Sequence, residues 1–239
     1  MWKLPRICKI FFSSIGHPDA RLDPLTLDFE TGEHTILQLD NSGGKSSILG
    51  LFYSVIRPRK TEFMGKEENR SIDDYIKEDD LACVAMKWIM DEQSSEEYLV
   101  TGSVYEWHSG NLERFYFSFY HKGNPAPDQL TIQSLPLMKD GKRLTIAGFK
   151  EEMKGYKERN PEQKVFLTNG IQEWMQHLDE CHIDTQTFYY QLIMNKQEGQ
   201  ADDFFSFKSN KEFIDFFIDL VHNPEAVQGS FELLKKLMG

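Results

Sequence analysis

The chain has 239 residues and a formal net charge of −11, and 40% of its residues are hydrophobic, including 18 Phe and 9 Tyr. This composition favours one large or two small globular domains and argues against an intrinsically disordered chain. No apolar run is long enough for a membrane helix, and Met1–Arg6 lacks the features of a secretory signal. The cysteines, Cys8, Cys83 and Cys181, are widely spaced, which fits a reducing compartment. We therefore expect a cytoplasmic protein that does not cross a membrane.

The first part of the chain, residues 7–39, is predicted to be rich in β-strands. Apolar residues dominate Ile7–Phe12 and alternate through Leu25–Phe29, as expected for two strands. A third apolar run, Ile36–Leu39, is typical of a short buried strand. This third strand leads directly into a glycine turn.

The glycine turn has the composition of a loop that wraps the phosphates of a nucleotide. It consists of Asn41, Ser42, Gly43, Gly44, Lys45, Ser46 and Ser47. Backbone N–H groups of such a turn converge on an anion, and the following helix adds the positive end of its dipole. Lys45 is placed for phosphate and Ser46 for Mg²⁺. The first glycine of the strict pattern is replaced by Leu39, and Gly43 supplies backbone freedom nearby.

A helix and an antiparallel meander are predicted after this turn. The apolar stripe over Ile48–Ile56 predicts a buried helix that ends at Pro58. Residues 57–81 are polar and predict a loop with a short helix around Ile72–Ile76. Three strands then follow with turn-rich separators, at Ala82–Met90, Tyr98–Trp107 and Arg114–His121.

A hairpin comes next, and from about residue 147 the pattern becomes mainly helical. Asp140-Gly141 is a hairpin turn between Leu135–Lys139 and Lys142–Ile146. Helices are then predicted over Phe149–Lys157, Ile171–Leu178 and Lys211–Val221, and from Pro224 to the last residue, with a buried strand over Thr187–Met194.

Two further groups are candidates for nucleotide chemistry. Gln197 lies on a glycine-containing loop, where an amide can reach a Mg²⁺ or an attacking water, although a polar surface loop has the same composition. Asp91 and Glu92 end an apolar strand, as a Mg²⁺ site would, but acidic turn residues after a strand are common.

The order of these features resembles the N-terminal half of an ABC-type ATPase head of the SMC superfamily, which includes MukB-like and SbcC-like proteins. Within it, the chain is most similar to the SMC-like ATPases of bacterial defence systems such as Wadjet. The resemblance implies an α/β fold with a mixed core sheet, an antiparallel meander and a helical C-terminal part. It implies a half-head over residues 1–222 and the start of a coiled-coil helix over residues 223–239.

The resemblance also implies roles for individual residues and partners. Asn41, Gly44, Lys45, Ser46 and Ser47 match the phosphate loop, and Gln197 matches the glutamine that senses Mg²⁺ and the γ-phosphate. An arginine that contacts the nucleotide would be one of Arg57, Arg59 and Arg70. Ser42 stands where the family usually has glycine. The cofactors would be ATP and Mg²⁺.

In the complete assembly, the signature motif and the catalytic carboxylate would come from a C-terminal half of the same head. Two heads would enclose ATP as a homodimer and act with kleisin-like or other accessory subunits on DNA at the nucleoid, in chromosome maintenance, repair or defence against plasmids and phage. Two other functions stay open. One is a self-contained phosphate-loop NTPase or kinase that uses Asp91 and Glu92 for Mg²⁺. The other is a non-catalytic interaction module whose imperfect loop binds no nucleotide.

Overall fold

The computed structural model describes most of the chain up to residue 189. The described residues are 5–17, 20–29, 45–59, 71–78, 80–90 and 97–189. The chain separates into two compact units, Met1–Thr185 and Gln186–Gly239. The helix expected at Lys211–Val221 and the coiled-coil start expected over residues 223–239 lie outside the described residues. The boundary expected between residues 222 and 223 therefore stays a prediction.

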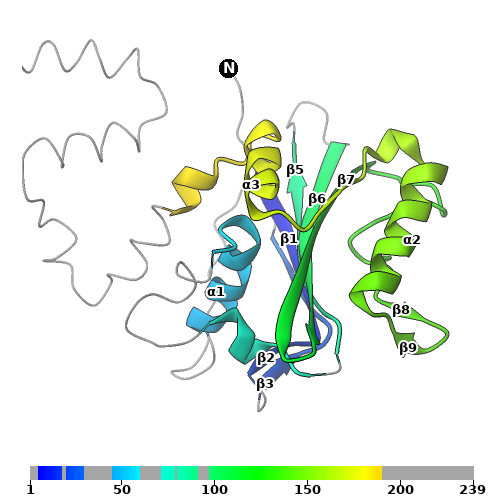
Figure 1. Ribbon diagram of the computed structural model, residues 1–239. Coiled ribbons are helices and arrows are strands. Elements are labelled where there is room, and N and C mark those ends of the chain that lie inside the picture. Colours follow the sequence, from blue (N-terminus) through cyan, green and yellow to red (C-terminus); the bar gives the residue numbers. More distant parts are fainter. Residues whose placement is uncertain are drawn as a thin grey trace, which may run out of the picture. The chain divides into compact units, whose positions relative to one another are not determined.

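A six-stranded sheet forms the centre of the first unit (Figure 1). The strand order is β10-β7-β6-β5-β1-β4, and every pairing in it is antiparallel. The strands are β1 (Arg6–Ser13), β4 (Leu25–Asp28), β5 (Ala82–Ile89), β6 (Glu97–His108), β7 (Asn111–Lys122) and β10 (Phe166–Thr168). The two predicted N-terminal strands and the predicted meander are thus confirmed. The mixed core sheet stays a prediction, because it depends on Ile36–Leu39, outside the described residues.

Helices cover both faces of this sheet (Figure 1). The helices α1 (Lys45–Ile56) and α3 (Ile171–Glu180) lie on one face, and α2 (Ile146–Arg159) lies on the other. Side chains alternate between the faces of a strand, so Tyr116 of β7 stacks on Trp174 of α3, whereas its neighbours Phe115 and Phe117 pack against Phe149 of α2. The three helices expected in this part of the chain are confirmed, and α1 ends just before Pro58 as the sequence predicts.

Two short predicted features are also confirmed. The turn at Asp140-Gly141 joins β8 (Met138–Lys139) to β9 (Lys142–Arg143), and both turn residues have positive φ, 50° and 74°. This is the backbone conformation that an Asp-Gly hairpin turn requires. The short helix expected near residue 72 is the 3₁₀ helix η2 (Ile72–Tyr75).

Four small elements are missed by the sequence patterns. They are β2 (Ile15–His17), β3 (Ala20–Leu22), the 3₁₀ helix η3 (Pro161–Gln163) and β10. Each has only three residues, too few to show a hydrophobic period. Among the described residues, no helix is long and apolar enough to cross a membrane.

The strand predicted over Thr187–Met194 is wrong where the structure describes it, because residues 185–189 are helical. A short apolar run does not by itself distinguish a strand from a buried helix segment. Here the carboxylate of Asp179 accepts the backbone N–H of Thr185 at 3.1 Å, which satisfies a donor in the first turn. Asp184, directly before the helical residues, is a residue type that favours helix starts and was the available signal.

Candidate functional site

The structure describes only part of the predicted nucleotide site. Lys45 and Ser46 begin α1, but nothing can be said of their side chains, and Ser47 is the first residue of the motif whose side chain is described. Several predicted site residues lie outside the described residues, and their roles stay predictions: Asn41, Ser42, Gly43, Gly44, Arg70, Asp91, Glu92 and Gln197.

The helix α1 begins where a phosphate-binding helix would begin. Its first residue is Lys45, directly after the two glycines, and its first turn carries no acidic residue. The first backbone N–H groups of a helix have no partner within the helix, and together they form the positive end of its dipole. An anion at this end therefore meets no competing carboxylate from the first turn of α1.

Ser47 makes a hydrogen bond that the sequence does not predict. Its Oγ lies 3.1 Å from Oη of Tyr75, which is buried in η2. Ser71 and Asp74 close a capping box around the start of η2: Ser71 Oγ accepts the N–H of Asp73, and Asp74 accepts the N–H of Ser71 at 2.7 Å. The capping signature marks this short helix in the sequence. It gives no sign that Tyr75 contacts the phosphate-loop motif.

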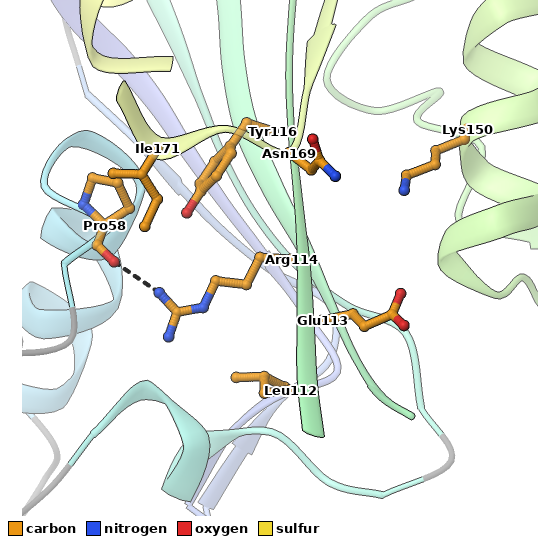
Figure 2. A pocket seen from close by; sticks show the side chains of 8 residues that line it. All are labelled: Pro58, Leu112, Glu113, Arg114, Tyr116, Lys150, Asn169 and Ile171. Carbon is orange, nitrogen blue, oxygen red and sulfur yellow. Dashed lines mark hydrogen bonds between the residues drawn. The ribbon is translucent and has the colours of Figure 1, made fainter. Parts of the chain in front are cut away.

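The far end of α1 is held by side chains from three other elements. The last four carbonyl groups of a helix lack partners within it, and each needs one when it is buried. Nε1 of Trp174 donates to the carbonyl of Val55 in the last turn at 2.6 Å. Two residues beyond the helix, the carbonyl of Pro58 accepts from Nη1 of Arg114 at 2.7 Å (Figure 2). Ser54 Oγ lies 3.1 Å from Oη of Tyr105.

The sheet beneath α1 carries buried polar groups that are hydrogen-bonded to one another. Ser103 donates to Oη of Tyr105 at 2.6 Å, and Nε1 of Trp88 donates to Thr101 at 2.8 Å. Burial raises the pKa of the Tyr105 hydroxyl, although its bonds to Ser103 and Ser54 oppose this. Such a network fixes one orientation of α1 more strictly than apolar contacts alone. The network reaches α1 at Ser54, near the C-terminal end of the helix.

A pocket lies at the far end of α1, and it is not the predicted phosphate site. It has a volume of about 610 Å³ and is lined by Pro58, Leu112, Glu113, Arg114, Tyr116, Lys150, Asn169 and Ile171 (Figure 2). The 12 residues of α1 span about 18 Å at about 1.5 Å per residue. The pocket, which begins beyond the last turn of α1, is therefore a separate feature from a phosphate site at Lys45.

The length of α1 also separates two of the candidate arginines from the predicted phosphate site. Arg57 and Arg59 follow the last residue of α1, at the opposite end from Lys45, and Arg57 is buried there while Arg59 is exposed. The structure does not bring either one to the start of α1. Which arginine would contact a nucleotide therefore stays open.

The strand that precedes Asp91 and Glu92 ends in a hairpin. The backbone N–H of Met90, directly after β5, donates to the carbonyl of Glu97 at 3.2 Å, and β5 pairs with β6 along its whole length. The described strands on either side of residues 91–96 thus form a β-hairpin, and acidic residues between the strands of a hairpin are common for turn formation alone. Their proposed role at Mg²⁺ stays a prediction.

A cluster of nucleophile-type side chains lies on the α3 side of the sheet but lacks the features of a catalytic site. Ser118 Oγ is 2.7 Å from Nε2 of His177, and Cys181 Sγ is 3.7 Å from the same nitrogen. Burial lowers the pKa of His177 and raises the pKa of the Cys181 thiol. Ser118 is fully buried, and a raised thiol pKa opposes formation of the reactive thiolate. The cluster therefore stabilises the packing of α3.

Neither a metal-binding cluster in the described residues nor a comparison with known proteins identifies the site further. Within the described residues, no group of three His, Cys, Asp or Glu side chains could hold a metal ion, and the cysteines Cys8, Cys83 and Cys181 are free. No family model and no curated protein matches the chain.

Proposed function

We propose that the chain is the ATP- and Mg²⁺-binding N-terminal half of an SMC-like ABC-type ATPase head. The observation that carries the proposal is the start of α1 at Lys45, immediately after a glycine pair and without an acidic residue in the first turn. A glycine turn followed directly by a helix start is an arrangement used to bind phosphates, and the sequence motif and this helix start together support the proposal. The support of α1 by Trp174, Arg114 and Tyr105 is consistent with a helix that must hold its first residues in place.

In this proposal each residue of the motif has a distinct task. The turn Asn41–Gly44 would surround the phosphates with backbone N–H groups, Lys45 would bind the β- and γ-phosphates, and Ser46 would hold Mg²⁺ together with Gln197. Mg²⁺ would neutralise phosphate charge. The C-terminal half of the head, a second head, accessory subunits and DNA would complete the machine.

The test is a calorimetric titration of the purified chain with ATP and Mg²⁺. We expect binding by the wild type and at least a tenfold loss in Lys45→Ala, since one charge-assisted phosphate contact is worth roughly 1.5–3 kcal/mol. Lys154→Ala, which removes an exposed lysine of α2, is the matched control and should bind as the wild type does. Absence of binding by the wild type, or equal binding by Lys45→Ala, would refute the proposal.

The isolated chain should turn over ATP very slowly, because the proposed catalytic carboxylate and the partner's signature motif belong to other parts of the assembly. Steady hydrolysis that disappears in Lys45→Ala would contradict this half-head assignment and favour the self-contained NTPase. Loss of the Mg²⁺-dependent activity on substitution of Asp91 would then identify that residue as part of the metal site.

A further inference from the structure

The outer edge of β7 is only partly covered in the structure. The edge strand β10 pairs with Tyr116, Phe117 and Ser118 and no further, because the chain leaves the sheet to begin α3 at Ile171. Further toward the C-terminal end of β7, Nε2 of Gln163 in η3 donates to the carbonyl of Tyr120 at 3.2 Å. In the part of the chain that the structure describes, no strand pairs with this edge between Asn111 and Phe115.

Two observations determine which backbone groups face outward along this stretch. A two-residue turn joins His108 to Asn111, and the register between β6 and β7 continues from that pair without a bulge. In such a hairpin the closing residues bond to each other, and the direction of the N–H and C=O groups alternates along the strand. The outward groups are therefore those of Leu112 and Arg114. The carbonyl of Tyr120, another even-numbered residue of β7, accepts the side-chain amide of Gln163 and therefore also faces outward. This agrees with the alternation derived from the turn.

The pocket described above surrounds this open edge (Figure 2). Pro58 and Ile171 lie on the side of α1 and α3, and Lys150 and Glu113 lie on the side of α2. An extended chain that followed the edge would direct alternate side chains to these two sides. The first side offers mainly apolar contacts, and its cation, Arg114, already donates to the carbonyl of Pro58 and lies 3.6 Å from Asp73. The second side offers charged groups.

The charges on the α2 side determine which side chain of a bound segment would be favoured there. Lys150 is half-buried, its Nζ lies 4.6 Å from the centroid of the Phe115 ring, and it makes no ion pair with any described residue. Glu113 is exposed to water. A half-buried ammonium gains more from an opposite charge than a hydrated carboxylate does, since solvent screens the exposed group.

We propose that the open edge of β7 at Leu112–Arg114 binds an extended peptide segment of a partner protein. The segment adds a strand in line with β10 and bonds to the outward backbone groups of Leu112 and Arg114. It turns apolar side chains toward Pro58 and Ile171 and an acidic side chain toward Lys150. This site does not depend on nucleotide binding, and it lies at the opposite end of α1 from Lys45.

The experiment is the selection of a phage-displayed library of random heptapeptides on the full chain, followed by anisotropy measurements on fluorescent copies of the enriched peptides. We expect sequences in which apolar residues alternate with an acidic residue. Leu112→Pro should weaken their binding at least tenfold, because proline removes an outward N–H. It removes no existing sheet bond, which is why proline is tolerated on an edge. Leu112→Ala, which keeps the N–H but shortens a side chain that lines the pocket, is the matched control and should bind the peptides more tightly than Leu112→Pro does.

A second variant keeps the test decisive if Leu112→Pro does not fold. Lys150→Glu should weaken the acidic peptides at least fivefold and shift the selection toward basic residues at the same position. If no peptide is enriched, the proposal is overturned. It is equally overturned if the enriched peptides bind a folded Leu112→Pro as they bind the wild type, or ignore the charge at position 150. A failure to bind ATP would leave these results unaffected.

Discussion

Replacement of Trp174 by phenylalanine tests whether α1 is held in place by α3. The indole of Trp174 is fully buried, stacks on Tyr116 with the ring centroids 5.4 Å apart, and donates its N–H to the carbonyl of Val55 at 2.6 Å. That carbonyl belongs to the last turn of α1, where the helix itself offers no donor. Trp174→Phe keeps an aromatic ring for stacking but removes the donor, and so leaves a buried carbonyl without its partner.

The expected loss in unfolding free energy has two parts. A buried acceptor left without its donor costs about 1–3 kcal/mol, and the smaller ring leaves a cavity worth about 1 kcal/mol more. The total is about 2–4 kcal/mol. For a protein of this size, 1 kcal/mol corresponds to a change in Tm of about 2–4 °C, so Tm should fall by about 4–16 °C.

Trp88→Phe is the matched control for this experiment. Trp88 is also buried and donates its Nε1–H at 2.8 Å, but the acceptor is Thr101 within the sheet. Urea denaturation should show a similar loss of stability in both variants. Hydrogen exchange measured by mass spectrometry should show faster exchange over residues 45–59 only in Trp174→Phe, under conditions where both variants are folded.

The reasoning is refuted if exchange over residues 45–59 is unchanged in Trp174→Phe, or if it rises equally in both variants. The first result would mean that the bond to Val55 contributes nothing to holding α1. The second would mean that α1 responds to general loss of stability and has no specific support from α3.

Three other predictions concern single contacts. Tyr75→Phe and Ser47→Ala should each weaken ATP binding or stability slightly. A double-mutant cycle should give a coupling free energy of about 0.5–1.5 kcal/mol between the two residues, since their hydroxyls bond to each other. Additive effects of the two substitutions would exclude a functional link between them. Gly102→Ala should destabilise the protein by about 2–4 kcal/mol in urea denaturation, because its Cβ would lie 2.4 Å from an aromatic ring carbon and 2.9 Å from a backbone oxygen, whereas Gly148→Ala in α2 should change little. Burial lowers the pKa of His177 below 6.5, so the unfolded chain binds more protons and the unfolding free energy should fall as the pH drops below about 6.5; this fall should be smaller in His177→Gln, and an unchanged pH profile would contradict the assignment.

Local patterns predict much of this fold. The long strands β5, β6 and β7 and the three helices each contain enough residues to show a clear period, and their turns contain residues that favour one backbone conformation. The helical segment at residues 185–189 is the exception, because an apolar run fits either state. In the structure, Asp179 of the preceding helix accepts the N–H of its first residue, Thr185. Short elements such as β10 form only because a neighbouring strand is already present.

The sequence alone determines the phosphate-loop motif, the helix that follows it and the antiparallel meander, because these depend on neighbouring residues. Only the tertiary structure decides which side chains support that helix. The bonds from Trp174 to Val55, from Arg114 to Pro58 and between Tyr75 and Ser47 join residues 28 to 119 positions apart. The open edge of β7 likewise follows from where β10 ends in space. Contacts of this kind depend on how separate elements pack, which no local pattern in the chain records.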